Sequence, residues 1–200
     1  MKLNITLTLT EEMLGTKPAN ANVFADFVAS KCEDDSKRKE ELETAEHIEE
    51  AGTTVFHKVE GQPILWDYQI KGFLKDALGS LNRMDKDMRA GLEKLTAHKT
   101  KVDGCVFPLA RVIPIQLPEG GRLGICERPL RAETAQGPRV SLCRSETVPA
   151  GSRIQFILAI LSKDLLPYVK AAFKYGELRG LGQWRNSGKG RFEAEITEAR

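Results

Sequence analysis

The stretch from Ser152 to Ile196, SRIQFILAILSKDLLPYVKAAFKYGELRGLGQWRNSGKGRFEAEI, holds four successive elements whose order decides the fold. The apolar run in SRIQFILAIL predicts a core strand. SKDLLPYVKAAFKYGEL predicts a helix with Ser162 as its N-cap and Gly176 as its stop. A glycine-rich loop follows the helix. RFEAEI then closes the stretch as a strand with one apolar face, formed by Phe192, Ala194 and Ile196.

Two segments outside this stretch complete the pattern. KLNITLTLT, residues 2–10, alternates apolar and polar residues, which predicts a half-buried strand. DYQIKGFLKDALGSLNRM, residues 67–84, spaces its apolar residues at helical intervals, and TTVFHKV before it predicts a short strand. The apolar helix positions are Ile70, Phe73, Leu74, Ala77, Leu78 and Leu81. The order of strands and helices predicts an α+β chain with a ferredoxin-like, split βαβ core.

The chain length suits one domain, residues 1–200, with two inserted segments. The first insertion, about 17–52, is highly charged and predicts a solvated helix or a partly disordered segment. The second, about 84–145, combines a polar helix near 84–98 with a β-hairpin at 105–131 that turns at Pro118–Gly121. The prolines at 108 and 114 place this hairpin at a sheet edge or outside the main sheet.

Charge is unevenly distributed along the chain. The net charge is only +2, but residues 1–60 hold 7 Lys/Arg against 13 Asp/Glu, and residues 61–200 hold 23 against 15. This asymmetry favours a polyanionic partner for the C-terminal part. No apolar run approaches the roughly 20 residues that cross a bilayer, and the N-terminus does not resemble a signal peptide. We therefore expect a cytoplasmic protein without a membrane partner.

The glycine-rich loop, residues 180–190, combines flexible backbone with cationic and aromatic side chains. Glycine permits close backbone approach, basic groups contact phosphates, and Trp184 can stack on a base. The loop matches neither a P-loop nor a dinucleotide fingerprint, and the cysteines include no CxxC pair, so we expect no cofactor and no metal. A solvated helix–strand connection remains the alternative. The residues concerned are Arg179, Gly180, Gly182, Trp184, Arg185, Gly188, Lys189, Gly190 and Arg191.

Four segments in order resemble the RAMP superfamily (repeat-associated mysterious proteins), and most of all the backbone subunits of type III CRISPR effector complexes, which serve antiviral defence. ITLTLTEEMLGT is similar to the family's opening strand and turn. GQPILWDYQIKGFLKDAL is similar to its entry into the first helix, and ETVPAGSRIQFILAI to its VPAGT-type strand. GLGQWRNSGKGRFE resembles its C-terminal glycine-rich loop and closing strand. Together the four segments cover about 80 residues.

The resemblance implies an RRM-like core that binds single-stranded guide RNA beside other effector subunits or copies of itself. It implies that Lys71, Gly72 and Lys75 lie near the RNA backbone. The glycine loop would cradle phosphates or support the first helix. The hairpin at 105–131 would be a thumb that carries Arg122, Arg128 and Arg131.

Two departures from the family pattern keep other functions open. Small residues expected before Lys71 are replaced by 65–69, Leu-Trp-Asp-Tyr-Gln, and the final loop contains Gln183 and Trp184. These changes and the acidic segment 33–50 favour a protein-interaction role without RNA. A weaker alternative is a ribonuclease. Asp26 would then support metal-dependent cleavage, or His57 would act as a general acid or base.

Overall fold

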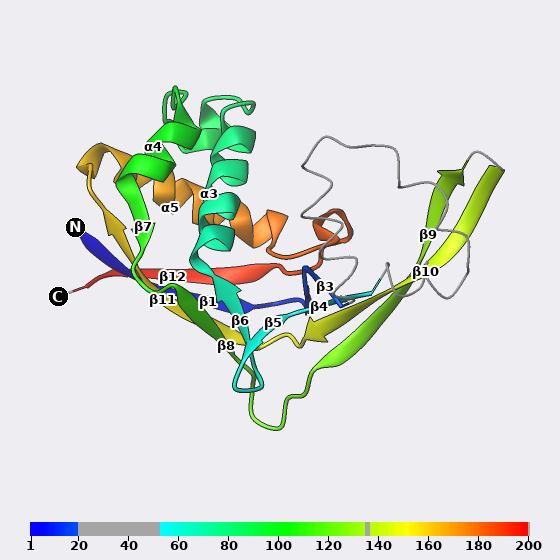
Figure 1. Ribbon diagram of the computed structural model, residues 1–200. Coiled ribbons are helices and arrows are strands. Elements are labelled where there is room, and N and C mark those ends of the chain that lie inside the picture. Colours follow the sequence, from blue (N-terminus) through cyan, green and yellow to red (C-terminus); the bar gives the residue numbers. More distant parts are fainter. Residues whose placement is uncertain (20–52, 135–136, 200) are drawn as a thin grey trace, which may run out of the picture.

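The computed structural model describes residues 1–19, 53–134 and 137–199. Its main sheet has the order β12–β1–β11–β8–β6–β5, with β7 also paired to β11 (Figure 1). A second sheet has the order β2–β10–β4–β3, with β9 paired to β10. The main-sheet strands are β1 (Lys2–Leu9), β5 (His57–Val59), β6 (Gln62–Trp66), β7 (Val106–Pro108), β8 (Val112–Gln116), β11 (Arg153–Ile160) and β12 (Phe192–Glu198). Those of the second are β2 (Met13–Leu14), β3 (Lys17–Pro18), β4 (Thr54–Val55), β9 (Gly124–Thr134) and β10 (Gly137–Val148).

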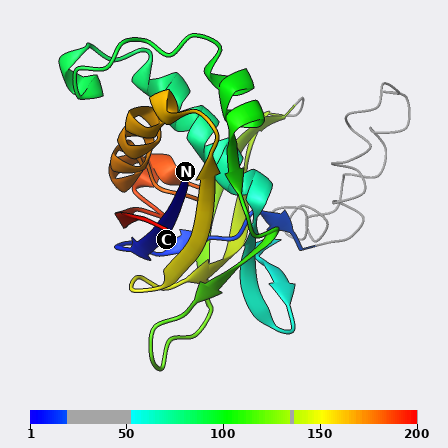
Figure 2. The same cartoon turned by 90° about the vertical axis from the view of Figure 1, so that its left-hand side faces the viewer.

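The predicted ferredoxin-like core is confirmed. Counting β7 and β8 as one interrupted strand, because both pair with the same edge of β11, the core strands run in the order four–one–three–two, and every pairing is antiparallel. Two long helices, α3 (Asp67–Leu81) and α5 (Leu166–Arg179), cover one face of this sheet, as the two views in Figures 1 and 2 show. This is the split βαβ arrangement that the alternation of strands and helices predicted.

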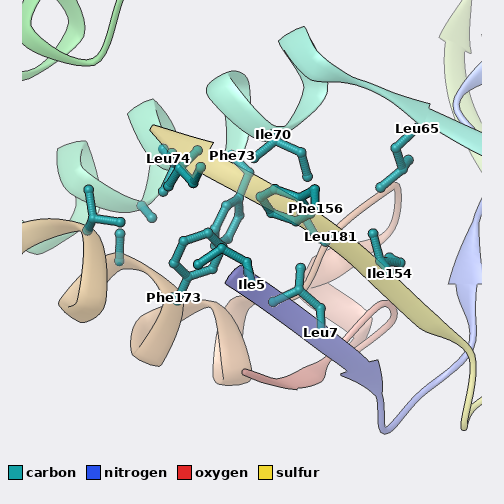
Figure 3. Packing of buried hydrophobic residues seen from close by; sticks show 14 of the residues in the cluster. Ile5, Leu7, Leu65, Ile70, Phe73, Leu74, Ile154, Phe156, Phe173 and Leu181 are labelled. Atoms are coloured by element: carbon teal, nitrogen blue, oxygen red, sulfur yellow. The ribbon is translucent and has the colours of Figure 1, made fainter. Parts of the chain in front are cut away.

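The core forms where the predicted apolar faces meet. All four apolar residues of β1 and all six of α3 that the spacing singled out are buried. Phe73 lies 5.6 Å from Phe173 and 5.8 Å from Phe192, measured between ring centroids, so helices and sheet meet in an aromatic cluster (Figure 3). Burying each such side chain stabilises the fold by about 1.5–3 kcal/mol.

Helix α5 differs from its prediction at both ends. A 3-10 turn, η2 (Lys163–Leu165), precedes it, and Ser162 makes no side-chain capping hydrogen bond. The helix also continues through Gly176 and ends at Arg179, where Gly180 takes φ +76°. Gly176 is a packing position, because a Cβ there would lie 2.5 Å from the ring atoms of both Phe73 and Phe192.

The predicted hairpin at 105–131 is wrong. The turn at Pro118–Gly121 exists, with Gly121 N donating to Pro118 O at 2.8 Å, but its flanking strands join different sheets. β8 pairs with β6 and β11, whereas β9 pairs along its whole length with β10. The long hairpin is therefore β9–β10, and it extends away from the helices (Figure 1).

The segment predicted as a polar helix near 84–98 is also mostly not helical. It contains one 3-10 turn, η1 (Asp87–Arg89), and helix α4 (His98–Cys105) begins only at its end. Side chains hold the segment compact, because buried Arg89 donates to Met84 O and Leu92 O, and Asn82 bonds both backbone groups of Leu95. The charged segment predicted before residue 52 lies, from residue 20 on, outside the described residues. No helix among the described residues is long and apolar enough to cross a membrane.

Candidate nucleic-acid interface

The glycine loop connects α5 to β12 and is anchored by its own backbone. Leu181 N donates to Gly190 O at 2.8 Å, which closes the loop on itself. Gly190 N donates to Glu12 O at 2.8 Å, which fixes the loop to the turn after β1. The loop is thus a packed element that connects the C-terminal part of the chain to the turn after β1.

Its glycines serve this close packing. Gly190 has φ +70°, and a Cβ there would lie 1.9 Å from Leu181 O. A Cβ on Gly180 would lie 2.4 Å from Lys189 O, and one on Gly182 would lie 2.7 Å from Leu14 O. The nearest atoms at all three positions belong to the protein's own backbone, so these glycines let two segments of this chain touch.

The basic residues of the loop all have partners within the protein. Asp76 on α3 accepts from Arg185 at 2.8 Å and lies 3.6 Å from Arg179. Lys189 lies 2.5 Å from Glu12, and Arg191 donates to Leu178 O at 3.1 Å. These four cations are paired with two carboxylates, and the charge of Glu11 also acts on Lys189, so cations still outnumber carboxylates in this cluster.

The ion pair with Glu12 has a measurable consequence for Lys189. The hydrogen bond that Lys189 donates to Glu12 raises the pKa of Lys189, burial opposes this rise, and the negative charge of Glu12 adds to it. The ammonium is therefore firmly cationic.

Trp184 connects the loop to the β9–β10 hairpin. Its backbone is left-handed, with φ +53°, and the residue is 38% exposed. The Arg128 guanidinium of β9 lies over the indole ring, 4.8 Å from its centroid, and donates to Gln183 Oε1 at 3.3 Å. Cation–π contacts of this kind contribute about 0.5–1 kcal/mol at exposed sites. Gln183 and Trp184, which form one of the two departures from the family pattern, therefore connect the loop to the β9–β10 hairpin through Arg128.

The other predicted site residues lie in two further places. Lys71 donates to Asp103 O at 3.1 Å and sits over the Phe107 ring, and Lys75 lies 2.6 Å from Asp103. Both lysines thus turn towards α4, whereas Gly72 on the neighbouring stripe of α3 is exposed. Arg122 is exposed before β9, and Arg131 lies on β9 opposite Val140.

Of the two catalytic candidates, the structure describes only His57. Asp26 lies outside the described residues. His57 is half-buried with its ring edge-on to Trp66, 5.8 Å between centroids, and burial followed by the charge of Lys17 lowers the pKa of His57. Within the described ranges, no three His, Cys, Asp or Glu side chains are grouped to hold a metal ion.

Sequence reasoning missed the three acidic partners, Asp76, Glu12 and Asp103. Asp76 carries a partial signal, because it lies four residues after Gly72 on the same stripe of α3. Glu12 and Asp103 give no local signal, since their partners are remote in sequence.

Comparison with known proteins identifies the fold. No protein-family model matches the chain, and no curated protein matches it in sequence. A chain of a type IV-B CRISPR complex matches with a TM-score of 0.50 and 10% identity, covering 100% of this chain and 91% of that one. A chain of the type III-B Cmr-beta complex bound to cognate target RNA matches with a TM-score of 0.48 and 13% identity. This protein covers 61% of the length of that second chain. The chain therefore shares its fold, along its whole length, with a chain of a type IV-B CRISPR complex.

Proposed function

We propose that this protein is a cytoplasmic, CRISPR-type effector subunit that holds single-stranded guide RNA beside other subunits or copies of itself. The observation that carries the proposal is the fold shared along the whole chain with a subunit of a type IV-B CRISPR complex. The sequence resemblance to RAMP backbone subunits is independent support, because its four segments come from both ends and the middle of the chain.

Local charge supports a polyanion at the glycine loop. The cations of the cluster around the loop outnumber its carboxylates, and its guanidinium groups keep N–H donors beyond those used by Asp76. The exposed indole of Trp184 offers a surface on which a base can stack. RNA would therefore cross the loop between α3 and the base of the hairpin.

A titration tests the proposal directly. Fluorescence anisotropy compares an unstructured single-stranded RNA with its duplex and with the same DNA strand, between about 50 and 200 mM salt. We expect tight, salt-sensitive binding of the single-stranded RNA. The triple variant Arg185→Gln, Lys189→Gln, Arg191→Gln should reduce the salt slope by about 2, at about 0.7 for each lost phosphate contact.

A charge-matched variant controls for net charge. Lys94, Lys99 and Lys163 are exposed and form no ion pair within the described part of the chain. Their segments lie towards α4 and the start of α5, at the end of the helix layer away from the loop (Figure 1). Changing all three to Gln should leave the slope nearly unchanged, and urea unfolding of both variants verifies that each remains folded. Equal slopes for both variants would remove the loop from the proposal.

One observation favours a protein-interaction role as the second candidate. Leu109, Ile157 and Leu161 are exposed apolar residues on or beside neighbouring strands, since Leu109 N donates to Ile157 O. The loop cations are also already paired within the chain. No RNA binding at low salt, together with a stable protein complex in pull-downs, would establish this role.

A further inference from the structure

A pocket of about 310 Å³ lies between the start of α3, β6, the β2–β3 segment and the glycine loop. It is separate from the ion pairs of Glu12 and from the contact between Arg128 and Trp184. The pocket opens beside Thr16 and Gly72, which are both exposed. Its volume is at the small end of the range for ligand pockets, so it suits a compact group and excludes a dinucleotide.

The floor of the pocket is apolar and partly aromatic. Phe56 and Phe73 line it and are each 5% exposed. Leu65, Ile70 and Leu181 also line the pocket, and Figure 3 shows them together with Phe73 in the packed hydrophobic core. These side chains are fixed by the core packing, so the floor is preformed.

The rim of the pocket is polar and keeps unused hydrogen-bonding capacity. Gln69 Nε2 donates to Thr16 Oγ1 at 3.0 Å, and Gln69 Oε1 accepts from Trp66 N at 2.8 Å. The second amide N–H of Gln69 and the hydroxyl of Thr16 can each make a further bond. On the opposite side, Arg185 and Asp76 form a pair at 2.8 Å, which supplies both a donor and an acceptor.

The geometry points to a binding site for one unstacked nucleobase, seated on the apolar floor with its polar edge against Gln69, Thr16 and Arg185. A base has apolar faces and a polar edge. The apolar floor and polar rim of the pocket complement this distribution. Arg179 and Arg185 beside the mouth would meet the attached phosphate. The inference rests on the proposed function, because it names the part of an RNA strand that this site takes.

Gly72 allows the pocket to be blocked without disturbing the fold. A Cβ on Gly72 meets no atom within 4 Å, and its φ is not positive, so Gly72→Leu places a side chain over the opening without a clash. Gly104 in α4 is equally exposed and equally open but does not line the pocket, so Gly104→Leu is the matched control. Both substitutions remove a helix glycine and should not destabilise the helices.

Two probes distinguish a base in a strand from a free nucleotide. The first is free adenosine or uridine monophosphate, whose binding is detected by saturation-transfer NMR. The second is a single-stranded RNA in which one base at a time is replaced by an abasic site or by fluorescent 2-aminopurine. We expect Gly72→Leu to weaken RNA binding by about 5- to 160-fold, the range for loss of one stacked base. Gly104→Leu should match wild type, and 2-aminopurine should change in fluorescence at particular positions.

The outcomes separate this inference from the proposed function. RNA binding that neither Gly72→Leu nor any abasic substitution weakens overturns the pocket and leaves RNA binding intact. Monophosphate binding that Gly72→Leu abolishes, without any RNA affinity, supports the pocket and overturns the guide-RNA function. Binding of neither probe by wild type overturns both. The 2-aminopurine and abasic series use the wild-type chain, so they decide the question even if a variant fails to fold.

Discussion

At the scale of single residues, the glycine loop depends on close contact more than on backbone freedom. Gly188 and Gly190 both have positive φ, but the atoms nearest a Cβ on Gly188 are 3.6 Å away, on Arg191. Gly188→Ala should therefore cost only the left-handed strain of about 1–2 kcal/mol. Gly190→Ala adds a clash with Leu181 O and should cost about 3 kcal/mol or more of the free energy of unfolding. If urea titrations show that Gly188→Ala and Gly190→Ala lose equal free energy of unfolding, the close packing at Gly190 is contradicted.

A second residue-scale prediction concerns His57. Burial and Lys17 lower its pKa below 6.5, so the folded chain binds fewer protons than the unfolded chain just below that pH. The stability that neutral His57 contributes is complete above about 6.5 and is lost as the pH falls towards the folded pKa. NMR titration should place the His57 midpoint below its value in urea, and Lys17→Met should raise it. The control Lys2→Met should leave the His57 midpoint unchanged. If Lys17→Met also leaves it unchanged, the charge of Lys17 is not a cause of the lowered pKa.

At the scale of elements, Asp76 fixes α3 to the glycine loop and holds two arginines away from other anions. Because Asp76 is 38% exposed, Asp76→Asn should cost only about 0.5–1 kcal/mol of stability, and less in high salt. The same change frees Arg179 and Arg185, so RNA affinity should rise at low salt. The salt slope should steepen by about 0.7 for each arginine that gains a phosphate. Weaker or unchanged RNA binding in the anisotropy assay would place the RNA elsewhere.

Element scale is also where prediction from sequence succeeds and fails. The periodicity of β1 and α3 fixed their buried faces, because one side of each element meets the core regardless of what lies opposite. The Pro118–Gly121 turn was visible, but the sheet that each flanking strand joins depends on residues far along the chain. The ion pairs show the same limit, since Arg185 and Asp76 are 109 residues apart and Lys189 and Glu12 are 177 apart. The candidate pocket is assembled from four such remote segments, so no local sequence pattern could predict it.

At the scale of the whole molecule, the chain has two faces with different chemistry. An RRM binds RNA on the open face of its sheet through aromatic side chains. Here that face of β12, β1 and β11 has no aromatic residue, and Glu193 and Glu195 lie opposite Thr8 and Thr6. The cations of this face, Lys2 and Arg153, are matched by these two carboxylates, so the face offers phosphates no net positive charge. The ferredoxin-like core therefore serves as a support, and we expect RNA on the side formed by α3, the glycine loop and the hairpin base.

Photo-crosslinking of 4-thiouridine RNA, read by mass spectrometry, distinguishes these two faces. Crosslinks should fall in residues 67–76, 124–129 and 180–191, and not in β1, β11 or β12. The variant Glu193→Gln, Glu195→Gln provides a second test, because removing two negative charges would tighten binding if RNA lay on the sheet. We expect its affinity to stay within about 2-fold of wild type, since these exposed groups are screened from a strand on the other side. Crosslinks at Asn4, Thr6 or Gln155 with tighter binding by this variant would reverse the assignment and make the open sheet face the RNA surface.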